Sequence, residues 1–508
     1  MTAATTPPGD ARLDPAFLSL PLQALADAGL SRARELGATH ADVRVERIRS
    51  QQLRVYDGAL QHAGDGSVLG VAVRVVHDGS WGFAAGVELT PAAVSALAEQ
   101  AVAVAKVARP MTLEPIELAE EPTHAGVTYV SAYEVNPFEI TTKEKVARLV
   151  DLSKGILGNG PVQHVAASLA QYQENKFYAD LAGTTATQQR VRLYPHLEAH
   201  GTDSGSGIFD SMATTLAPSG RGYEYVQADS LDAQVGALPE QLAEKLTAPT
   251  VQAGNYDLVI DPTNLWLTIH ESIGHATELD RALGYEANYA GTSFATPDKL
   301  NSLQYGSPVM NVTGDRTAEN GLATTGIDDD GVGTTSWDLI KDGVLVGYQL
   351  DRRTAKRYGF DASNGCAHAD SPLHVPIQRM ANVSLQPSPD DTSTADLIGT
   401  VDRGIYIVGD RSWSIDMQRY NFQFTGQRFY RIENGQLAGP LRDVAYQATT
   451  TDFWGAMEAV GGRDTYVLGG AFNCGKAEPG QVASVSHGCP SALFRGIRIL
   501  NTNEESGR

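Results

Sequence analysis

Apolar and polar residues in the first half of the chain alternate between a helical and a strand-like spacing. Apolar side chains three or four positions apart predict a helix, and apolar residues at every second position predict a strand. Helix-start signals such as Thr90-Pro91 and Thr141-x-x-Glu144 sharpen the pattern. The expected helices span residues 17–36, 90–107, 141–157 and 229–247, and the expected strands lie within 42–56, 68–86 and 165–202.

The second half has a different pattern, with one strand and one helix followed by short β-segments. Asp342-Gly343 and Asn434-Gly435, like Asp78-Gly79 in the first half, stand between apolar segments and favour two-residue hairpin turns. We therefore expect an α+β protein, with an N-terminal α/β domain followed by a β-rich C-terminal domain of antiparallel-sheet or barrel-like form. The expected parts are a disordered tail at 1–14, the N-terminal domain at 15–249 with a connector at about 110–140, and the β-rich domain at 250–508.

One segment of the second half combines a helix start with candidate metal ligands. Asp261-Pro262 places an N-cap residue and a proline at the first helical position, and the expected helix leads into residues 270–275, which read HESIGH. This HExxxH pattern is one residue longer than the common HExxH zinc motif. Neutral imidazoles bind zinc, zinc lowers the pKa of a bound water to about 7, and an adjacent carboxylate can accept its proton. We predict that His270 and His275 hold the metal and that Glu271 is the general base.

The spacing of the two histidines makes a demand on the helix. Residues five apart on a regular helix lie about 140° from each other, whereas residues four apart lie about 40° apart. A one-residue π-bulge would restore a shared face. Gly274 lies inside the insertion, where a backbone irregularity costs least. We therefore predict a bulged or kinked helix between His270 and His275; a straight helix would put them on opposite faces.

A catalytic zinc ion also needs a third protein ligand. Glu278 and Glu286 follow the motif, but each is first expected to be an ordinary surface carboxylate. Cys474 lies far along the chain among glycines and polar residues and close to Lys476, a setting that favours a thiolate. A reduced, buried structural cysteine is the alternative for this position.

Two other polar groups are assigned structural roles. Residues 328–331, Asp-Asp-Asp-Gly, lack the alternating oxygen ligands of an EF-hand and are expected to form a solvated turn. Cys489 lies beside His487, but the sequence offers no partner cluster for a second metal or thiol site there.

Composition narrows the function classes. The 508 residues are 42% hydrophobic and 19% charged, which is typical of a globular protein with more than one domain. A net charge of -21 disfavours nucleic acid as a partner. No run approaches 18 consecutive apolar residues and the first ten residues lack signal-peptide features, so no membrane association is expected. Three cysteines without an export signal favour the reducing cytoplasm.

The chain resembles the TldD/PmbA family over nearly its whole length, and in particular the metal-bearing, TldD-like subunit. The segments that carry the resemblance are 37–44, 70–74 and 79–84 in the first half, and 270–275, 329–331, 339–343, 379–382 and 473–476 in the second. The resemblance implies an α/β N-terminal domain and a β-rich peptidase domain. It also implies a Zn²⁺ ion held by His270, His275 and Cys474, with Glu271 as the base.

The resemblance further implies partners and substrates. TldD-like subunits pair with subunits called PmbA or TldE, which lack the motif, and the dimer encloses a proteolytic chamber. Substrates are unfolded or short peptides, including modified peptide antibiotics and an antitoxin. Because this chain keeps the full HExxxH pattern, we expect it to be the catalytic subunit of a dimer, with a motif-less paralogue or with itself. Extended peptides are expected to bind to exposed β-edges by strand addition.

Two alternatives stay open from the sequence. The first is a binding or assembly subunit whose zinc site is structural, with Glu278, Glu286 or His487 as a fourth ligand. The second is a zinc hydrolase of non-peptide amides, because the same chemistry can act on any acyl carbon.

Overall fold

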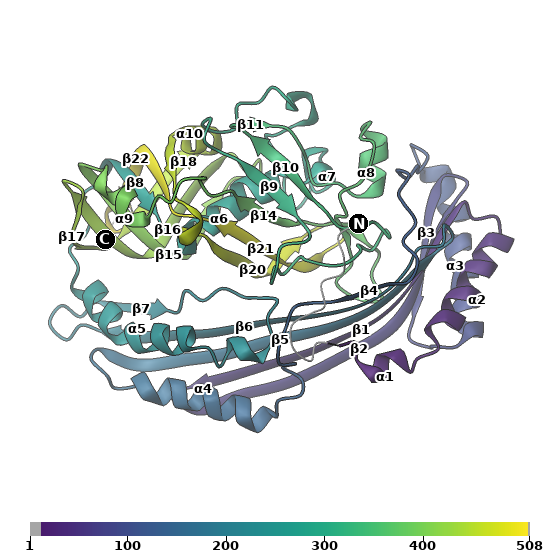
Figure 1. Cartoon of the computed structure of the whole chain (residues 1–508), viewed down its shortest axis with the longest axis horizontal. Coiled ribbons are helices and arrows are strands. Elements are labelled where there is room, and N and C mark those ends of the chain that lie inside the picture. The colour runs from purple at the N-terminus through teal and green to yellow at the C-terminus, as the bar shows by residue number, and fades with distance from the viewer. Residues whose placement is uncertain (1–11, 506–508) are drawn as a thin grey trace.

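The computed structural model describes residues 12–505, and two separate β-structures organise them (Figure 1). The N-terminal half is built on a seven-stranded sheet with the order β3-β2-β1-β5-β6-β4, in which β7 also pairs with β6. Neighbouring strands are antiparallel except for β4, which runs parallel to β6. The strands are β1 (His40–Tyr56), β2 (Ala59–His77), β3 (Ser80–Gly86), β4 (Val127–Val130), β5 (Val162–Asp180), β6 (Thr185–Thr202) and β7 (Phe209–Ala213). The helices are α1 (Pro15–Leu18), α2 (Leu22–Glu35), α3 (Pro91–Ala108), α4 (Thr142–Ile156) and α5 (Asp229–Thr247).

Alternation along the long strands gives this sheet two different faces. On β1, Val43, Val45, Leu53 and Val55 share one face because side chains an even number of positions apart point the same way. Helices α2 and α3 pack against the first pair and helices α4 and α5 against the second, so these four helices cover one face (Figure 1). The C-terminal half covers the other face, and the middle of the sheet is therefore buried on both sides.

A closed barrel forms the centre of the C-terminal half. Five strands close it in the order β15-β8-β22-β18-β16, because β16 also pairs with β15. This confirms the expected β-rich, barrel-like architecture and the α+β class. The barrel strands are β8 (Gly254–Ile260), β15 (Arg403–Ile415), β16 (Asn421–Glu433), β18 (Val444–Thr449) and β22 (Ala492–Asn501), with β17 (Gln436–Leu441) and β19 (Met457–Val460) attached.

Smaller sheets and short helices flank the barrel. The additional strands are β9 (Val312–Asp315), β10 (Ser336–Lys341), β11 (Val344–Leu345), β12 (Ala367–His368), β13 (Ile377–Gln378), β14 (Asn382–Leu385), β20 (Val467–Lys476) and β21 (Gln481–Cys489). The helices are α6 (Pro262–Ile269), α7 (Leu279–Ala282), α8 (Arg352–Arg357), α9 (Thr394–Gly399), α10 (Thr450–Gly455) and α11 (Thr502–Glu505). Helix α6, strands β20 and β21 and the barrel strand β15 build the candidate site.

Local sequence signals predicted several element ends correctly. Thr90 caps α3, Thr141 and Glu144 form a capping box on α4, and Asp261 caps α6. The three predicted hairpin turns also form, and the first residue of each turn has a positive φ of 48° or 49°. One hairpin escaped prediction: β1 and β2 join at Asp57-Gly58, and β2 begins nine residues before the expected 68–86 segment, with a largely exposed and polar start.

The limits predicted for the tail and for the two domains stay predictions. Residues 1–11 of the tail lie outside the described part of the chain. Asp14, at its end, caps α1 and pairs with Arg47. Within residues 12–505, one segment, Pro91–Met111, is long and apolar enough to cross a membrane by length and composition alone. In the structure its helix α3 packs its apolar side against the N-terminal sheet.

A buried group of charged side chains, here called the seam cluster, joins the two halves. Its members come from β1, β2, β5 and β6 on one side and from the loop after β9 on the other. They are Asp42, Arg44, Glu46, Arg74, Glu174, Lys176, Arg190, Arg192, Asp329 and Asp330. Lys176 Nζ lies 2.7 Å from Asp329 Oδ1, and Arg74 Nη2 lies 2.7 Å from Asp330 Oδ1.

The prediction of a solvated turn at residues 328–331 is therefore wrong. Asp328, Asp329 and Asp330 are only 2%, 3% and 5% exposed. Cations that lie 153 and 256 residues earlier in the chain compensate the second and third carboxylates. The first accepts hydrogen bonds from the backbone N–H groups of residues 330, 332 and 367. Burial was hidden from the sequence because none of these partner cations is local.

Glu46 is the least satisfied member of the seam cluster. Its side chain is fully buried, and neither carboxylate oxygen accepts a hydrogen bond from the described residues. Lys176 Nζ and Arg44 Nε lie 3.3 Å and 3.4 Å from its oxygens. Burial outweighs these cations and raises the pKa of Glu46 to about 7.

Replacing Asp329 by Asn is expected to lower the free energy of unfolding by about 3–5 kcal/mol, because the buried Lys176 would lose its nearest carboxylate. Asp338→Asn is the matched control. Asp338 pairs with Lys341 at the surface, where the side chains are 49% and 62% exposed, and its loss should cost at most about 1 kcal/mol. Urea unfolding followed by tryptophan fluorescence measures both. Equal losses would contradict a special role for the seam pair.

The pKa of Glu46 also predicts a pH dependence of stability. The folded chain binds this proton more tightly than the unfolded chain, whose carboxyl has a pKa near 4.5. The stabilisation is fully present below the unfolded pKa and is lost as the pH rises through about 7. Glu46→Gln resembles the protonated form at every pH. The urea midpoint of the wild type should therefore fall relative to that of Glu46→Gln between pH 5 and pH 8; parallel curves would argue against a raised pKa.

Candidate active site

The HESIGH segment continues helix α6 but changes its winding. Asp261 Oδ1 accepts a hydrogen bond of 3.0 Å from the N–H of Thr263, which fixes the start of α6. After Ile269 the chain forms a π-helical turn, His270–Gly274, and then a 3₁₀ turn, His275–Thr277. The predicted bulge between the two histidines is confirmed.

Gly274 has no side chain, and this lets neighbouring residues pack against the π-helical turn. Its φ of −52° is helical, so any residue could adopt its backbone conformation. A Cβ atom there would lie 2.7 Å from Met380 Sδ and 3.5 Å from His487 Cε1. The glycine therefore leaves the space that Met380 and His487 occupy, whereas the sequence interpretation ascribed it to backbone freedom.

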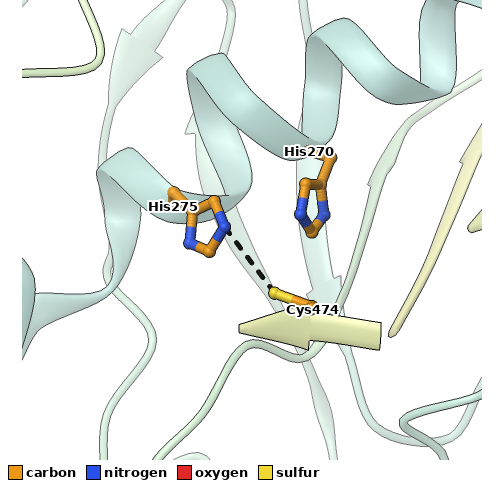
Figure 2. A group of neighbouring side chains, drawn as sticks. All are labelled: His270, His275 and Cys474. Carbon is orange, nitrogen blue, oxygen red and sulfur yellow. Dashed lines mark hydrogen bonds between the residues drawn. The ribbon is translucent and has the colours of Figure 1, made fainter. Parts of the chain in front are cut away.

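His270, His275 and Cys474 gather at one point (Figure 2). Both imidazoles project from the helix toward Cys474 on β20, and one possible ligand atom from each residue lies within 4.8 Å of the other two. Cys474 Sγ is 3.6 Å from His275 Nε2. A tetrahedral zinc ion with Zn–N of about 2.0–2.1 Å and Zn–S of about 2.3 Å separates nitrogen and sulfur by roughly 3.6 Å. The spacing and the chemistry of these donors thus fit zinc.

A hydrogen-bond chain behind His270 fixes its tautomer. Burial holds the pKa of His487 well below its ordinary value, so this ring is neutral. His487 Nδ1 donates to Val383 O at 2.9 Å, which leaves His487 Nε2 to accept from His270 Nδ1 at 2.7 Å. Because Nδ1 donates to His487, the neutral form of His270 carries its free lone pair on Nε2.

His275 is fixed in the same way from another direction. Its Nδ1 donates to Glu278 Oε2 at 2.8 Å, and burial holds its pKa well below the ordinary value. Burial alone would raise the pKa of Glu278, but Lys476, 3.0 Å away, and the bond from His275 hold it well below its usual range. His275 therefore also presents a free Nε2.

The expectation that Glu278 and Glu286 are surface carboxylates is wrong. The two residues are 0% and 1% exposed. Glu278 bonds to His275, and Glu286 accepts from Arg281 Nη2 at 3.0 Å. Lys476, which the sequence connects only with Cys474, pairs with both carboxylates, and this remote cation explains why they can be buried.

Cys474 and Cys489 occupy different environments. Arg379, 1% exposed, donates to the backbone oxygen of Cys474 at 2.6 Å and to that of Gln481 at 3.2 Å, which ties β20 and β21 in place. Cys489 lies under the start of α6, with Sγ 3.6 Å from Pro262 O. Burial raises its pKa well above the ordinary value. This agrees with a structural role for Cys489.

Glu271 lies beside these donors and has a partner that the sequence did not reveal. Arg419 Nη1 donates to Glu271 Oε2 at 2.6 Å. Arg419 lies in the turn between β15 and β16 and has a φ of 62°. Thr450 Oγ1 donates to its backbone oxygen at 2.7 Å. The 148 residues that separate the pair leave no local signal of the contact.

A cavity of about 420 Å³ opens beside the cluster, between the two halves of the chain. The N-terminal half contributes Tyr194 and residues 214–218, and the C-terminal half contributes side chains from α6, β15 and β20. Strand β20 pairs with β21 alone among the described strands, so its other edge is unpaired. An imidazole pair, a thiol, a carboxylate and a strand edge without a second strand partner thus meet in one cavity.

Known proteins with similar sequences are metalloproteases. A metalloprotease of Methanocaldococcus jannaschii is 26% identical over 422 residues, which cover 83% of this chain and 89% of that protein. A zinc metalloprotease TldD homologue of Saccharolobus solfataricus is 22% identical over 482 residues, which cover 92% and 98% of the two chains.

Solved structures share the fold. A candidate DNA gyrase modulator of Thermotoga maritima aligns with a TM-score of 0.73 at 19% identity, covering 93% of this chain and 99% of its own. TldE from Thermococcus kodakarensis aligns with a TM-score of 0.68 at 19% identity, covering 92% and 98%.

Family sequence models give the assignment. The PmbA/TldA metallopeptidase C-terminal domain matches residues 253–501, and domain 1 of the same family matches residues 41–105. These matches include the barrel, the HESIGH helix and Cys474, as well as the first strands of the N-terminal sheet. The chain belongs to the PmbA/TldD family of metallopeptidases.

Proposed function

We propose that the chain is the catalytic subunit of a zinc-dependent peptidase, with His270, His275 and Cys474 as the zinc ligands and Glu271 as general base. The observation that carries the proposal is the convergence of two imidazoles and a cysteine sulfur beside a carboxylate in one cavity. The two Nδ1 atoms are already hydrogen-bonded, so both Nε2 atoms are oriented for a ligand.

The donor set supports a catalytic rather than a closed structural site. Catalytic zinc sites use three protein ligands and keep one position open. Glu278 and His487, two of the alternatives for a fourth ligand, bond to the far nitrogens of the histidines, and Glu286 pairs with Arg281 and Lys476. When bound, zinc would supply Lewis acidity to a peptide carbonyl and to water.

Glu271 would move the proton. Arg419 holds Oε2 and thereby fixes the carboxylate plane, which leaves Oε1 to accept a proton from the attacking water. The same oxygen would then deliver the proton to the departing amine. Arg419 touches the carboxylate and not the metal ligands in this scheme, and its role is to position Glu271.

The cavity suits an extended peptide. The unpaired edge of β20 can add a substrate strand through backbone hydrogen bonds, directly beside Cys474. Residues 214–218 of the N-terminal half form the opposite wall. A space of about 420 Å³ admits a few residues of an unfolded or short peptide and excludes a folded domain.

We further propose that the chain works in a dimer, with a motif-less TldE/PmbA-like subunit or with itself, in the cytoplasm. The fold shared with an archaeal TldE supports a partner of this kind. The three cysteines are free and buried, which suits a reducing compartment.

Zinc content and peptide hydrolysis test the proposal together. The wild type should hold about one zinc per chain, and Cys474→Ser and His270→Ala should each lose it. Glu271→Gln should keep the zinc and lose about 10²–10⁴-fold in hydrolysis, since it removes only the base. Plasma emission spectrometry gives the metal content, and quenched fluorescent peptides report cleavage by the chain, alone and with a motif-less partner.

Each failure has its own meaning. Zinc retained by Cys474→Ser would move the third ligand to another residue. Zinc-loaded wild type that cleaves no peptide even with its partner would favour a binding subunit, and cleavage of small amides alone would favour a non-peptide hydrolase.

Variants of His487 distinguish whether this residue orients His270 or binds the metal itself. His487→Leu removes the acceptor for His270 Nδ1 and should weaken zinc binding about 10–100-fold without abolishing it. His487→Gln can still accept that bond and should recover part of the affinity. Competition with a chelator measures both, and circular dichroism of the zinc-free proteins controls for folding. Complete loss of zinc in His487→Leu, as in His270→Ala, would make His487 a ligand.

A further inference from the structure

The cavity holds a second carboxylate that the proposed reaction does not use. Asp410 on β15 lines the cavity together with Glu271, Arg419 and Trp266. Its Oδ1 accepts a hydrogen bond from Trp266 Nε1 at 3.2 Å. Within residues 12–505, no other residue forms a hydrogen bond with the Asp410 side chain.

Asp410 lacks a cationic partner. In the described part of the chain, no lysine, arginine or histidine nitrogen lies within 4.0 Å of its carboxylate. The neighbouring Arg411 turns away to Asp210, 3.1 Å distant, and Arg419 is engaged with Glu271. Burial raises the pKa of Asp410, because the charged carboxylate loses water in this cavity and no cation compensates it.

The strand is shaped to present this carboxylate. The pairing of β15 with β16 shifts its register between Asp410 and Trp413. Such bulges redirect side chains beside functional sites. Trp266, which holds Asp410, lies about one helical turn before His270. A group bound to Asp410 would thus lie within a few residues of the bond to be cleaved.

The surroundings favour a cation. Aromatic side chains line the same cavity and can accept a cation on their ring faces; they are Tyr194, Trp266, Trp413 and Phe472. The chain as a whole has a net charge of -21, which attracts cationic ligands.

We propose that Asp410 is a specificity-determining residue that binds an ammonium or guanidinium group of the peptide substrate. The cation is either a lysine or arginine side chain or the amino terminus of the peptide. This inference rests on the proposed peptidase function and adds a substrate class to it: extended peptides with a positive charge near the cleaved bond.

Matched peptides test the inference. One series of quenched peptides carries a single lysine, moved stepwise along a neutral sequence, and a second series carries norleucine, which has a similar stem but no charge. Each is made with a free and with an acetylated amino terminus. At one position the wild type should prefer the charged peptide roughly ten- to hundredfold in kcat/KM, mainly through KM. A preference that follows lysine identifies a side chain, and one that follows the free terminus identifies the α-ammonium group.

Asp410→Asn should reduce this preference to near one, because the amide can still accept from Trp266 but carries no charge. The zinc content should stay that of the wild type. Asp338→Asn, at the exposed surface, is the control and should keep the preference. Equal losses of Asp410→Asn on charged and neutral peptides would show that Asp410 only holds Trp266, and would overturn the inference.

A binding measurement keeps the inference separate from the proposed function. Fluorescence anisotropy of labelled lysine and norleucine peptides with Glu271→Gln, and with Glu271→Gln carrying Asp410→Asn, needs no turnover. Tighter binding of the charged peptide that disappears with Asp410→Asn supports the inference even if no hydrolysis is found. Equal binding of both peptides to Glu271→Gln overturns it, while hydrolysis without charge preference would leave the peptidase function intact.

Discussion

The site depends on one extra residue in a helical turn. A regular helix would separate His270 and His275 by about 140°, and the π-helical turn brings them to a common face. Such a turn weakens the regular backbone ladder, and buried carbonyls need partners. Side chains supply them: Gln349 Nε2 donates to Gly274 O at 2.7 Å, and Thr277 Oγ1 donates to Ile273 O at 2.9 Å. Tyr305 likewise donates to Ser272 O. The irregular turn is thus held by groups outside it.

This turn alone does not define the third donor or the histidine tautomers. Cys474 arrives on β20, 199 residues after His275, and its place depends on the β20–β21 pair and on Arg379. The backbone oxygen of Val383 on β14 accepts the last hydrogen bond of the series that runs from His270 through His487 and orients His270. Several remote strands therefore have to assemble before the donors converge. The donor cluster thus depends on the folding of the barrel and of the sheets beside it.

The sequence predicted what is encoded locally. N-caps, hairpin turns and the demand for a bulge follow from residue types within a few positions, and all were found. Burial of charge was predicted poorly because it depends on remote partners. Asp329 and Glu278 look like surface residues until Lys176 and Lys476 are placed beside them. Cys474 was singled out by its setting and by resemblance, whereas nothing in the sequence connected Arg419 with Glu271.

The seam cluster holds the N-terminal half against the C-terminal half, and the N-terminal half thereby helps to form the cavity. Residues 214–218 form one wall of the cavity, so its width depends on how the N-terminal sheet is held against the C-terminal half. Apolar surfaces could slide against each other, but ion pairs such as Lys176–Asp329 and Arg74–Asp330 hold only in one register. These directional contacts would hold residues 214–218 in a fixed position relative to β20. The opposite wall of the cavity belongs to the other half of the chain, and buried ion pairs hold the two halves together.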